Sequence, residues 1–292
     1  MLFKKQRFIQ MMKETSFLTI AEHFKAIFLD SYGVIKNYKG LIDGVQDTIN
    51  FIRSKNIALR ILTNDASRSQ HQQAESFYKL GLRTIETHEI ITSGMMARQF
   101  LQNKITHGKI AYLGTENSAE YILQSGLEHI AVRDIELDKI DDITAFVFLD
   151  DEGFDWNTDI NKTINFLRRK NIPVIVANSD KMYPVSRNDV SVATGGLAKL
   201  IENMLDKKFI HFGKPDSQMF MYAFDQLNQK SFYSKDEILM VGDNLNTDIL
   251  GGNKFGVKTT LVLSGNTRAE NAEMQINASG IIPDYICKSI VC

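Results

Sequence analysis

Asp30 and Thr63 each stand directly after a short apolar run, where a side chain can reach a ligand. Asp30 follows residues 26–29, and Gly33 behind it permits a sharp turn. Thr63 follows residues 58–62, and its hydroxyl, with the amides that open a following helix, could bind a phosphate oxygen. Taken singly, each residue type is more typical of a helix cap or a turn, so the chemistry depends on what accompanies it.

Two further segments supply a cation and a pair of acids. Lys214 lies in the sequence Gly-Lys-Pro-Asp, where its ammonium group could neutralise phosphate charge, although a lone lysine is usually solvated surface. Asp243 and Asp248 follow the apolar run 238–241 and form a hard, oxygen-rich set suited to Mg²⁺. The four segments together favour a phosphate site beside a magnesium site.

The apolar runs predict the sheet that positions these residues. Short runs that end abruptly at a polar residue are typical of buried parallel strands. These runs are 26–29, 58–62, 174–177 and 238–241. Helical patterns lie between them, one starting after Gly44 and another stopping at Gly81. This alternation predicts a doubly wound, Rossmann-like α/β fold with a parallel sheet, in which ligands bind at the carboxyl ends of the strands.

The middle third of the chain carries an α/β pattern of its own. Strand-like runs occur at 110–113, 145–149 and 173–177, with a helical stretch at 160–169. At 292 residues, two lobes are also a better expectation than one. The predicted organisation is an N-terminal surface segment at 1–20, a core at 21–103 and 208–292, and an inserted α/β domain at 104–207.

Composition excludes several classes of function. The 34 basic and 35 acidic side chains nearly cancel, which removes the usual footprint of a nucleic-acid-binding protein. No apolar run is long enough to span a membrane, and residues 1–12 predict an amphipathic surface segment rather than a secretory signal. The only cysteines, Cys287 and Cys292, support neither a disulfide framework nor a structural zinc site. We therefore expect a cytoplasmic protein that binds neither nucleic acid nor membrane.

The four segments resemble the four motifs of the haloacid dehalogenase (HAD) superfamily. The resemblance is greatest to its class IIA phosphatases, the p-nitrophenyl phosphatase, pyridoxal phosphate phosphatase and phosphoglycolate phosphatase types. These have Leu-Thr-Asn-Asn-Ser-Ser-Arg where this chain has residues 62–68, and Asn-Pro-Asp where it has 178–180. They also insert an α/β cap between the second and third motifs, where residues 104–207 lie here. The resemblance covers nearly the whole chain after about residue 20.

The resemblance implies a role for each motif residue. Asp30 would attack phosphorus to give an aspartyl phosphate, which splits one difficult step into two easier ones. Thr63 and Lys214 would hold phosphoryl oxygens and offset their charge. The cap and the second motif would contact the substrate, a small phosphorylated metabolite. The residues implied in substrate binding are Thr63, Asn64, Asn178, Asp180, Gly195 and Lys214.

The same resemblance implies Mg²⁺ as the cofactor. Its ligands would be the carboxylates of Asp30 and Asp243 and the main-chain carbonyl of Tyr32, while Asp248 would order either the metal's water or Lys214. A homodimer formed through the cap is a further expectation.

Tyr32 departs from the family pattern. HAD phosphatases usually carry a second aspartate here, which protonates the leaving oxygen and then activates water. A phenol with a reference pKa near 10 is a poor base at neutral pH, and general acid–base help is worth roughly 10² to 10⁴ in rate. We therefore place Tyr32 among the catalytic residues but expect attenuated phosphatase activity.

Two alternatives remain open. Asp-x-Tyr-Gly is similar to the first motif of the 2-haloacid dehalogenases, but those enzymes work without Mg²⁺ and carry a smaller helical cap. The fold could also serve as a non-catalytic phosphometabolite-binding protein, although such a protein has no use for a nucleophile such as Asp30. We expect a Mg²⁺-dependent phosphatase, and the sequence does not identify its substrate.

Overall fold

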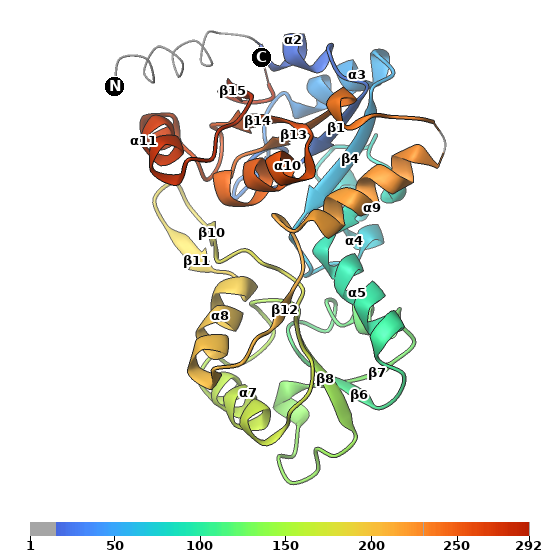
Figure 1. Cartoon of the computed structure of the whole chain (residues 1–292), viewed down its shortest axis with the longest axis vertical. Helices are drawn as coiled ribbons and strands as arrows, with labels where there is room; N and C mark the ends of the chain where they lie inside the picture. The colour runs from blue at the N-terminus through green and yellow to red at the C-terminus, as the bar shows by residue number, and fades with distance from the viewer. Residues whose placement is uncertain (1–15, 230, 292) are drawn as a thin grey trace. The chain divides into compact units, whose positions relative to one another are not determined.

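The chain forms two compact units in the computed structural model, which describes residues 16–229 and 231–291 (Figure 1). Of the predicted surface segment at 1–20, residues 1–15 lie outside the described residues. The prediction was wrong for Phe17 and Ile20, whose apolar side chains are buried in a hydrophobic core. The first unit comprises the described residues of 1–63, 74–91 and 214–292. The second comprises 64–73 and 92–213, so it contains the whole predicted insert together with residues expected in the core.

The first unit is built on a sheet whose strand order is β15-β14-β13-β1-β4-β5. All the pairings among β15, β14, β13, β1 and β4 are parallel. The strands are β1 (Ala26–Leu29), β4 (Ala58–Thr63), β5 (Ile90–Thr92), β13 (Ile238–Gly242), β14 (Lys258–Val262) and β15 (Tyr285–Cys287). The predicted strands at 26–29, 58–62 and 238–241 are confirmed.

Helices and short elements complete this part of the chain. As predicted, α3 begins directly after Gly44, and α4 ends just before Gly81. The helices are α2 (Phe17–Ala21), α3 (Val45–Ser54), α4 (Gln70–Lys79), α9 (Ser217–Asn228), α10 (Leu250–Phe255) and α11 (Ala269–Ser279). The short elements are β2 (Lys36–Asn37), β3 (Gly40–Leu41), η1 (Thr87–Glu89), η3 (Lys235–Glu237) and η4 (Leu245–Ile249).

The core of the first unit covers one face of this sheet. Alternate residues of a strand point to opposite faces, and Leu29, Ile61 and Val241 contribute fully buried side chains to one cluster. Ile49 and Ile52 of α3 pack into the same cluster. Because the strand ends are anchored in this way, the residues that follow them have fixed positions.

The second unit has its own parallel sheet, in the order β12-β9-β8-β6-β7. Its strands are β6 (Lys109–Leu113), β7 (Glu128–Ala131), β8 (Ile143–Phe148), β9 (Val174–Val176) and β12 (Ile210–His211), with a hairpin of β10 (Met182–Pro184) and β11 (Val190–Val192). Its helices are α5 (Ser93–Lys104), α6 (Glu120–Leu123), α7 (Thr158–Arg169) and α8 (Thr194–Leu205), with a short 3-10 helix η2 (Val132–Asp134). The predicted strands and helix of the middle third are confirmed.

Both units therefore have parallel sheets flanked by helices, and the predicted α/β fold class is confirmed. Within the described residues, none of the helices combines the length and the apolarity that crossing a membrane requires.

Candidate active site

Three adjacent strands of the first unit bring the predicted catalytic residues to one edge of the sheet. Leu29 of β1 lies beside Val241 of β13 on one side and beside Ile61 of β4 on the other. The residues directly beyond these positions therefore share the carboxyl edge of the sheet. Asp30 follows β1, Asp243 follows β13, and Thr63 is the last residue of β4.

Lys214 connects these strand ends through its buried ammonium group. Its Nζ donates to Asp30 Oδ1 at 2.5 Å and to the main-chain carbonyl of Leu62 at 2.8 Å. It also forms an ion pair with Asp248 Oδ1 at 2.7 Å. The ammonium group is thus surrounded by oxygens from the end of β1, from β4 and from the segment of Asp248. The lysine side chain is 2% exposed, which makes it a fixed part of the site.

The charge of Lys214 is secured by its neighbours. Burial alone would lower its pKa, but the carboxylates of Asp248 and Asp30 raise the pKa above its ordinary value. The ammonium group therefore stays protonated at neutral pH. A permanent positive charge next to Asp30 would favour an anionic ligand.

Asp243 is held by a residue that sequence reasoning missed. Its Oδ2 accepts hydrogen bonds from the main-chain N–H of Asn266 at 2.6 Å and from the Asn266 side-chain amide at 2.9 Å. Burial, together with the nearby charges of Asp30 and Asp248, raises the pKa of Asp243 well above its ordinary range. The surroundings of Asp243 therefore disfavour its ionised form, and a nearby positive charge would stabilise that form.

The acidic cluster fits a divalent cation. Carboxylate oxygens of Asp30, Asp243 and Asp248 lie within 4.8 Å of one another. Three carboxylates share the single ammonium group of Lys214, which leaves a net negative charge in a buried place. All the donors are hard oxygens, the ligands that Mg²⁺ prefers. Whether the main-chain carbonyl of Tyr32 is a further ligand stays a prediction.

Two glycines, Gly33 and Gly242, allow the acidic side chains to lie close to the backbone. Gly33 has φ +82°, and a side chain there would overlap the carboxylate of Asp243. A side chain at Gly242 would likewise overlap Asp248. Asp248 lies in the π-helical turn η4, and its Oδ2 accepts from the main-chain N–H of Asn244 at 3.1 Å. The glycines are therefore needed for the close approach of the acids.

Tyr32 remains a phenol rather than a phenolate. Burial, followed by the charge of Asp243, raises its pKa above the ordinary value of 10.0. Its hydroxyl is consequently protonated at neutral pH. At neutral pH the fraction of phenolate that could act as a base is therefore even smaller than the residue type alone implies.

The predicted substrate-binding residues of the second unit lie together. The Asn64 side-chain amide donates to Ser179 Oγ at 3.1 Å and to Asp180 Oδ1 at 2.9 Å. Asn178 accepts from the main-chain N–H of Asp180 at 2.9 Å, and a side chain at Gly195 would overlap the backbone of Ser179. The glycine therefore allows α8 to approach this turn. Contact of any of these residues with substrate stays a prediction.

An acid pair in the second unit was also missed by sequence reasoning. Asp150 is 8% exposed, accepts from Thr115 Oγ1 at 3.0 Å, and has a pKa raised to about 6 by burial. Burial also raises the pKa of Asp151, whose Oδ2 accepts from the Tyr183 hydroxyl at 2.9 Å. Both acids follow β8, so the predicted strand at 145–149 could have identified them as candidate site residues.

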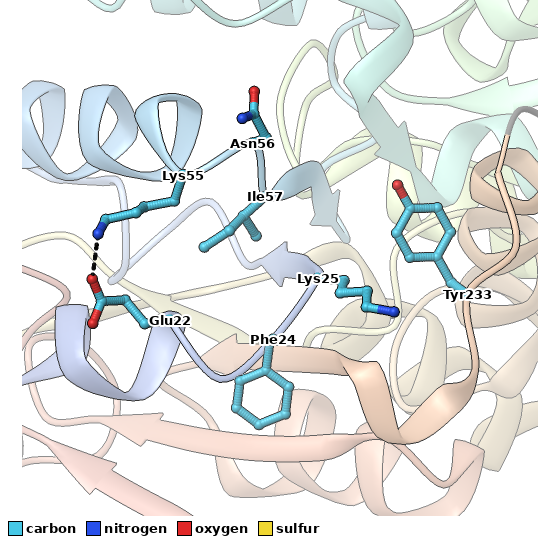
Figure 2. Close-up of a pocket in the computed structure, with 7 residues that line it drawn as sticks. All are labelled: Glu22, Phe24, Lys25, Lys55, Asn56, Ile57 and Tyr233. Atoms are coloured by element: carbon cyan, nitrogen blue, oxygen red, sulfur yellow. Dashed lines mark ion pairs between the residues drawn. The ribbon is translucent and has the colours of Figure 1, made fainter.

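A cavity of about 510 Å³ lies at the opposite edge of the first unit's sheet (Figure 2). Lys25 precedes β1 and Ile57 precedes β4, so both line it from the amino ends of the strands. Lys55 forms an ion pair with Glu22 at 2.7 Å in its wall. The cavity is completed by Phe24, Asn56 and Tyr233. It is therefore separate from the acidic cluster around Asp30.

Family models match both ends of the chain. A model for haloacid dehalogenase-like hydrolases matches residues 27–128, and a HAD-hydrolase-like model matches residues 211–291. The two ranges contain Asp30 and Thr63 in the first and Lys214, Asp243 and Asp248 in the second.

Relatives match nearly the whole chain. A crystal structure from Cytophaga hutchinsonii, titled a possible sugar phosphatase of the HAD superfamily, is 50% identical, covers 96% of this chain and 99% of its own, and has a TM-score of 0.93. Phosphoglycolate phosphatase 2 of Arabidopsis thaliana is 28% identical and covers 96% of each chain. Glycerol phosphate phosphatase from Mycobacterium tuberculosis, in complex with magnesium, is 22% identical, covers 94% of this chain and 77% of its own, and has a TM-score of 0.72.

Removing the Lys214 charge should strongly destabilise the protein. A Lys214→Met variant would leave Asp30 and Asp248 buried without their counter-ion, which typically costs about 3–5 kcal/mol. Urea unfolding in a chelator would measure the loss. Lys258→Met is the matched control, because its ion pair with Asp284 is half-exposed and should contribute at most about 1 kcal/mol. Equal losses in the two variants would contradict the central role of Lys214.

Asp150 should make stability depend on pH. Its pKa is about 6 in the folded state against an ordinary 3.8, so between these values only the folded protein holds the proton. Stability should therefore fall as pH rises through this window, by up to about 3 kcal/mol. In urea unfolding, Asp150→Asn should become more stable relative to the native protein from pH 4 to pH 7. Asp138→Asn, at a fully exposed position, should show no such trend, and a pH-independent difference for Asp150→Asn would refute the assignment.

Proposed function

This chain belongs to the HAD superfamily of hydrolases, and from that premise we propose that it is a phosphatase of class IIA acting on a small phosphorylated metabolite. The observation that carries the proposal is the Lys214 ammonium group, which is shared between Asp30 and Asp248 at 2.5 and 2.7 Å. The phosphatase names of the relatives, among them the possible sugar phosphatase, support a phosphate ester as the substrate.

Asp30 is the proposed nucleophile. One of its carboxylate oxygens bonds to phosphorus as the bond from phosphorus to the leaving oxygen breaks, and an aspartyl phosphate results. Water then attacks this intermediate and releases inorganic phosphate with restored Asp30. Lys214 and Thr63 hold phosphoryl oxygens through both steps, and the charge of Lys214 offsets theirs.

The proposed cofactor is Mg²⁺, held by Asp30 and Asp243. When bound, it would offset the charge of the phosphoryl oxygens and orient the phosphate for attack. The magnesium complex of a phosphatase with the same fold supports this assignment. The cluster of three carboxylates around one ammonium group also speaks against a 2-haloacid dehalogenase, which works without the metal.

A panel of phosphorylated metabolites, assayed with Mg²⁺, tests the proposal. Replacing Asp30 by Asn should abolish turnover, because an amide cannot form the aspartyl phosphate. Ser54→Ala is a suitable control, since its hydroxyl donates to the main-chain carbonyl of Phe51 at the end of α3, next to the cavity at the opposite edge of the sheet. Retained turnover in Asp30→Asn would refute the proposed mechanism.

Chelation of the metal is the second arm of this experiment. Hydrolysis should stop in chelator and return on addition of Mg²⁺. Full activity in chelator, combined with halide release from chloropropionate, would refute the phosphatase proposal and support a 2-haloacid dehalogenase. Binding of phosphorylated metabolites without any turnover would replace it by a non-catalytic binding protein.

Tyr32 should restrict the enzyme to esters with good leaving groups. Aryl and acyl phosphates depart without much protonation, whereas alkyl phosphates leave as basic alkoxides that need a proton. Since the missing aspartate would also have activated water, a burst followed by slow turnover is expected. Tyr32→Asp should raise steady turnover by roughly tenfold or more, most of all for alkyl phosphates.

The folding of Tyr32→Asp must be checked by circular dichroism, because the loss of an aromatic ring can leave a destabilising cavity. Tyr38→Asp, at an exposed position, controls for the added charge. A correctly folded Tyr32→Asp enzyme that is no faster on any ester would show that Tyr32 is not limiting.

A homodimer through the second unit is the proposed assembly. Met182 and Val192 are cross-strand partners in the β10–β11 hairpin, and they are 58% and 46% exposed. Tyr183, the next residue along β10, points to the other face and donates to Asp151, so one face of the hairpin is anchored and the opposite face presents apolar side chains. In sedimentation velocity, Val192→Asp should shift the protein from dimer to monomer, whereas Met274→Asp on α11 should not. Identical sedimentation of both variants and the native protein would refute this interface.

A further inference from the structure

Tyr121 of α6 lies at the centre of a buried hydrogen-bond chain in the second unit. Its ring is 1% exposed. Its hydroxyl donates to the main-chain carbonyl of Arg68 at 2.7 Å and lies 2.6 Å from Thr92 Oγ1. Arg68 belongs to the loop that follows Thr63, and Thr92 is the N-cap of α5. One hydroxyl thus links the second-motif loop to the start of a helix.

The direction of each hydrogen bond follows from the donors available. A carbonyl oxygen only accepts, so the single hydroxyl proton of Tyr121 points to Arg68. Thr92 must therefore donate to the Tyr121 oxygen, and its own oxygen accepts from the main-chain N–H of Met95 at 3.2 Å. Burial raises the pKa of Tyr121, which keeps this proton in place. The hydrogen bonds therefore run from Thr92 to Tyr121 to Arg68, and both hydroxyl protons are used.

The same helix start also holds the other end of the loop. Ser93 Oγ donates to the main-chain carbonyl of Asn64 at 2.8 Å. A side chain at Gly94 would overlap the Tyr121 ring, so this glycine lets the ring pack directly against α5. Loop 64–68 is thus fixed at Asn64 by Ser93 and at Arg68 by Tyr121.

The loop fixes the side chain of Asn64, whose amide donates to Ser179 and Asp180. We propose that Tyr121 is a positioning residue of the phosphatase, which holds loop 64–68 so that Asn64 and Asp180 present one fixed surface to the substrate. This inference rests on the proposed function. Tyr121 itself need not contact the substrate.

Tyr121→Phe tests the proposal, because it removes the hydroxyl and keeps the ring. With p-nitrophenyl phosphate, KM should rise roughly three- to tenfold, the factor that corresponds to one neutral hydrogen bond, while kcat changes little. Tyr112→Phe is the matched control. Its ring is also 1% exposed in this unit, but its hydroxyl donates to Glu116 at 2.9 Å, away from loop 64–68. Its KM should equal that of the native enzyme.

A double-mutant cycle separates positioning from general stability. If Tyr121 acts through Asn64, Tyr121→Phe should raise KM no further in an Asn64→Ala background. Additive effects, or an unchanged KM in the single variant, would overturn the proposal. A lowered melting temperature alone, without the change in KM, would show a merely structural role and would also overturn it.

Amide hydrogen exchange gives a readout that does not need turnover. Exchange in peptides spanning 64–68 should be faster in Tyr121→Phe than in the native protein and in Tyr112→Phe. Unchanged exchange would overturn the proposal, whatever the kinetics. If the native protein hydrolysed no phosphate ester, the proposed function would fail on its own, and faster exchange would still establish that Tyr121 holds the loop.

Discussion

The buried ammonium group of Lys214 is the constraint on which the rest of the site depends. A charge removed from water is costly unless partners surround it, and here two carboxylates and a main-chain carbonyl lie around the ammonium group. The lysine therefore fixes the end of β1, the end of β4 and the turn η4 relative to one another. The catalytic geometry and the local stability of this sheet edge have the same origin.

The parallel sheet explains why much of the candidate site could be predicted from the sequence. In a parallel sheet, residues that follow neighbouring strands share an edge, so Asp30, Thr63 and Asp243 could be placed together from the apolar runs alone. Asn266 could not be placed in this way. Its contact with Asp243 depends on the path of a loop after β14, and hydrophobic periodicity carries no information about such a path.

The boundaries between the units escaped prediction for a related reason. Segments 64–73 and 92–103 belong to the second unit, although they flank strands of the first. The hydroxyls of Ser93 and Tyr121 tie these segments together. Hydrogen bonds between residues far apart in sequence leave no trace in composition, and the chain has no proline- or glycine-rich linker to mark the crossing points.

Tyr32 shows how the acidic cluster affects its neighbours. Burial, and after it the negative charge of Asp243, raises the pKa of the Tyr32 phenol. A bound cation would oppose that shift, but a return to about 10 still leaves the phenol protonated at neutral pH. A phenol with so high a pKa is a weak acid towards a departing oxygen, and at neutral pH it cannot take a proton from water. In the proposed mechanism, tyrosine in place of aspartate should therefore slow both the departure of basic leaving groups and the hydrolysis of the aspartyl phosphate.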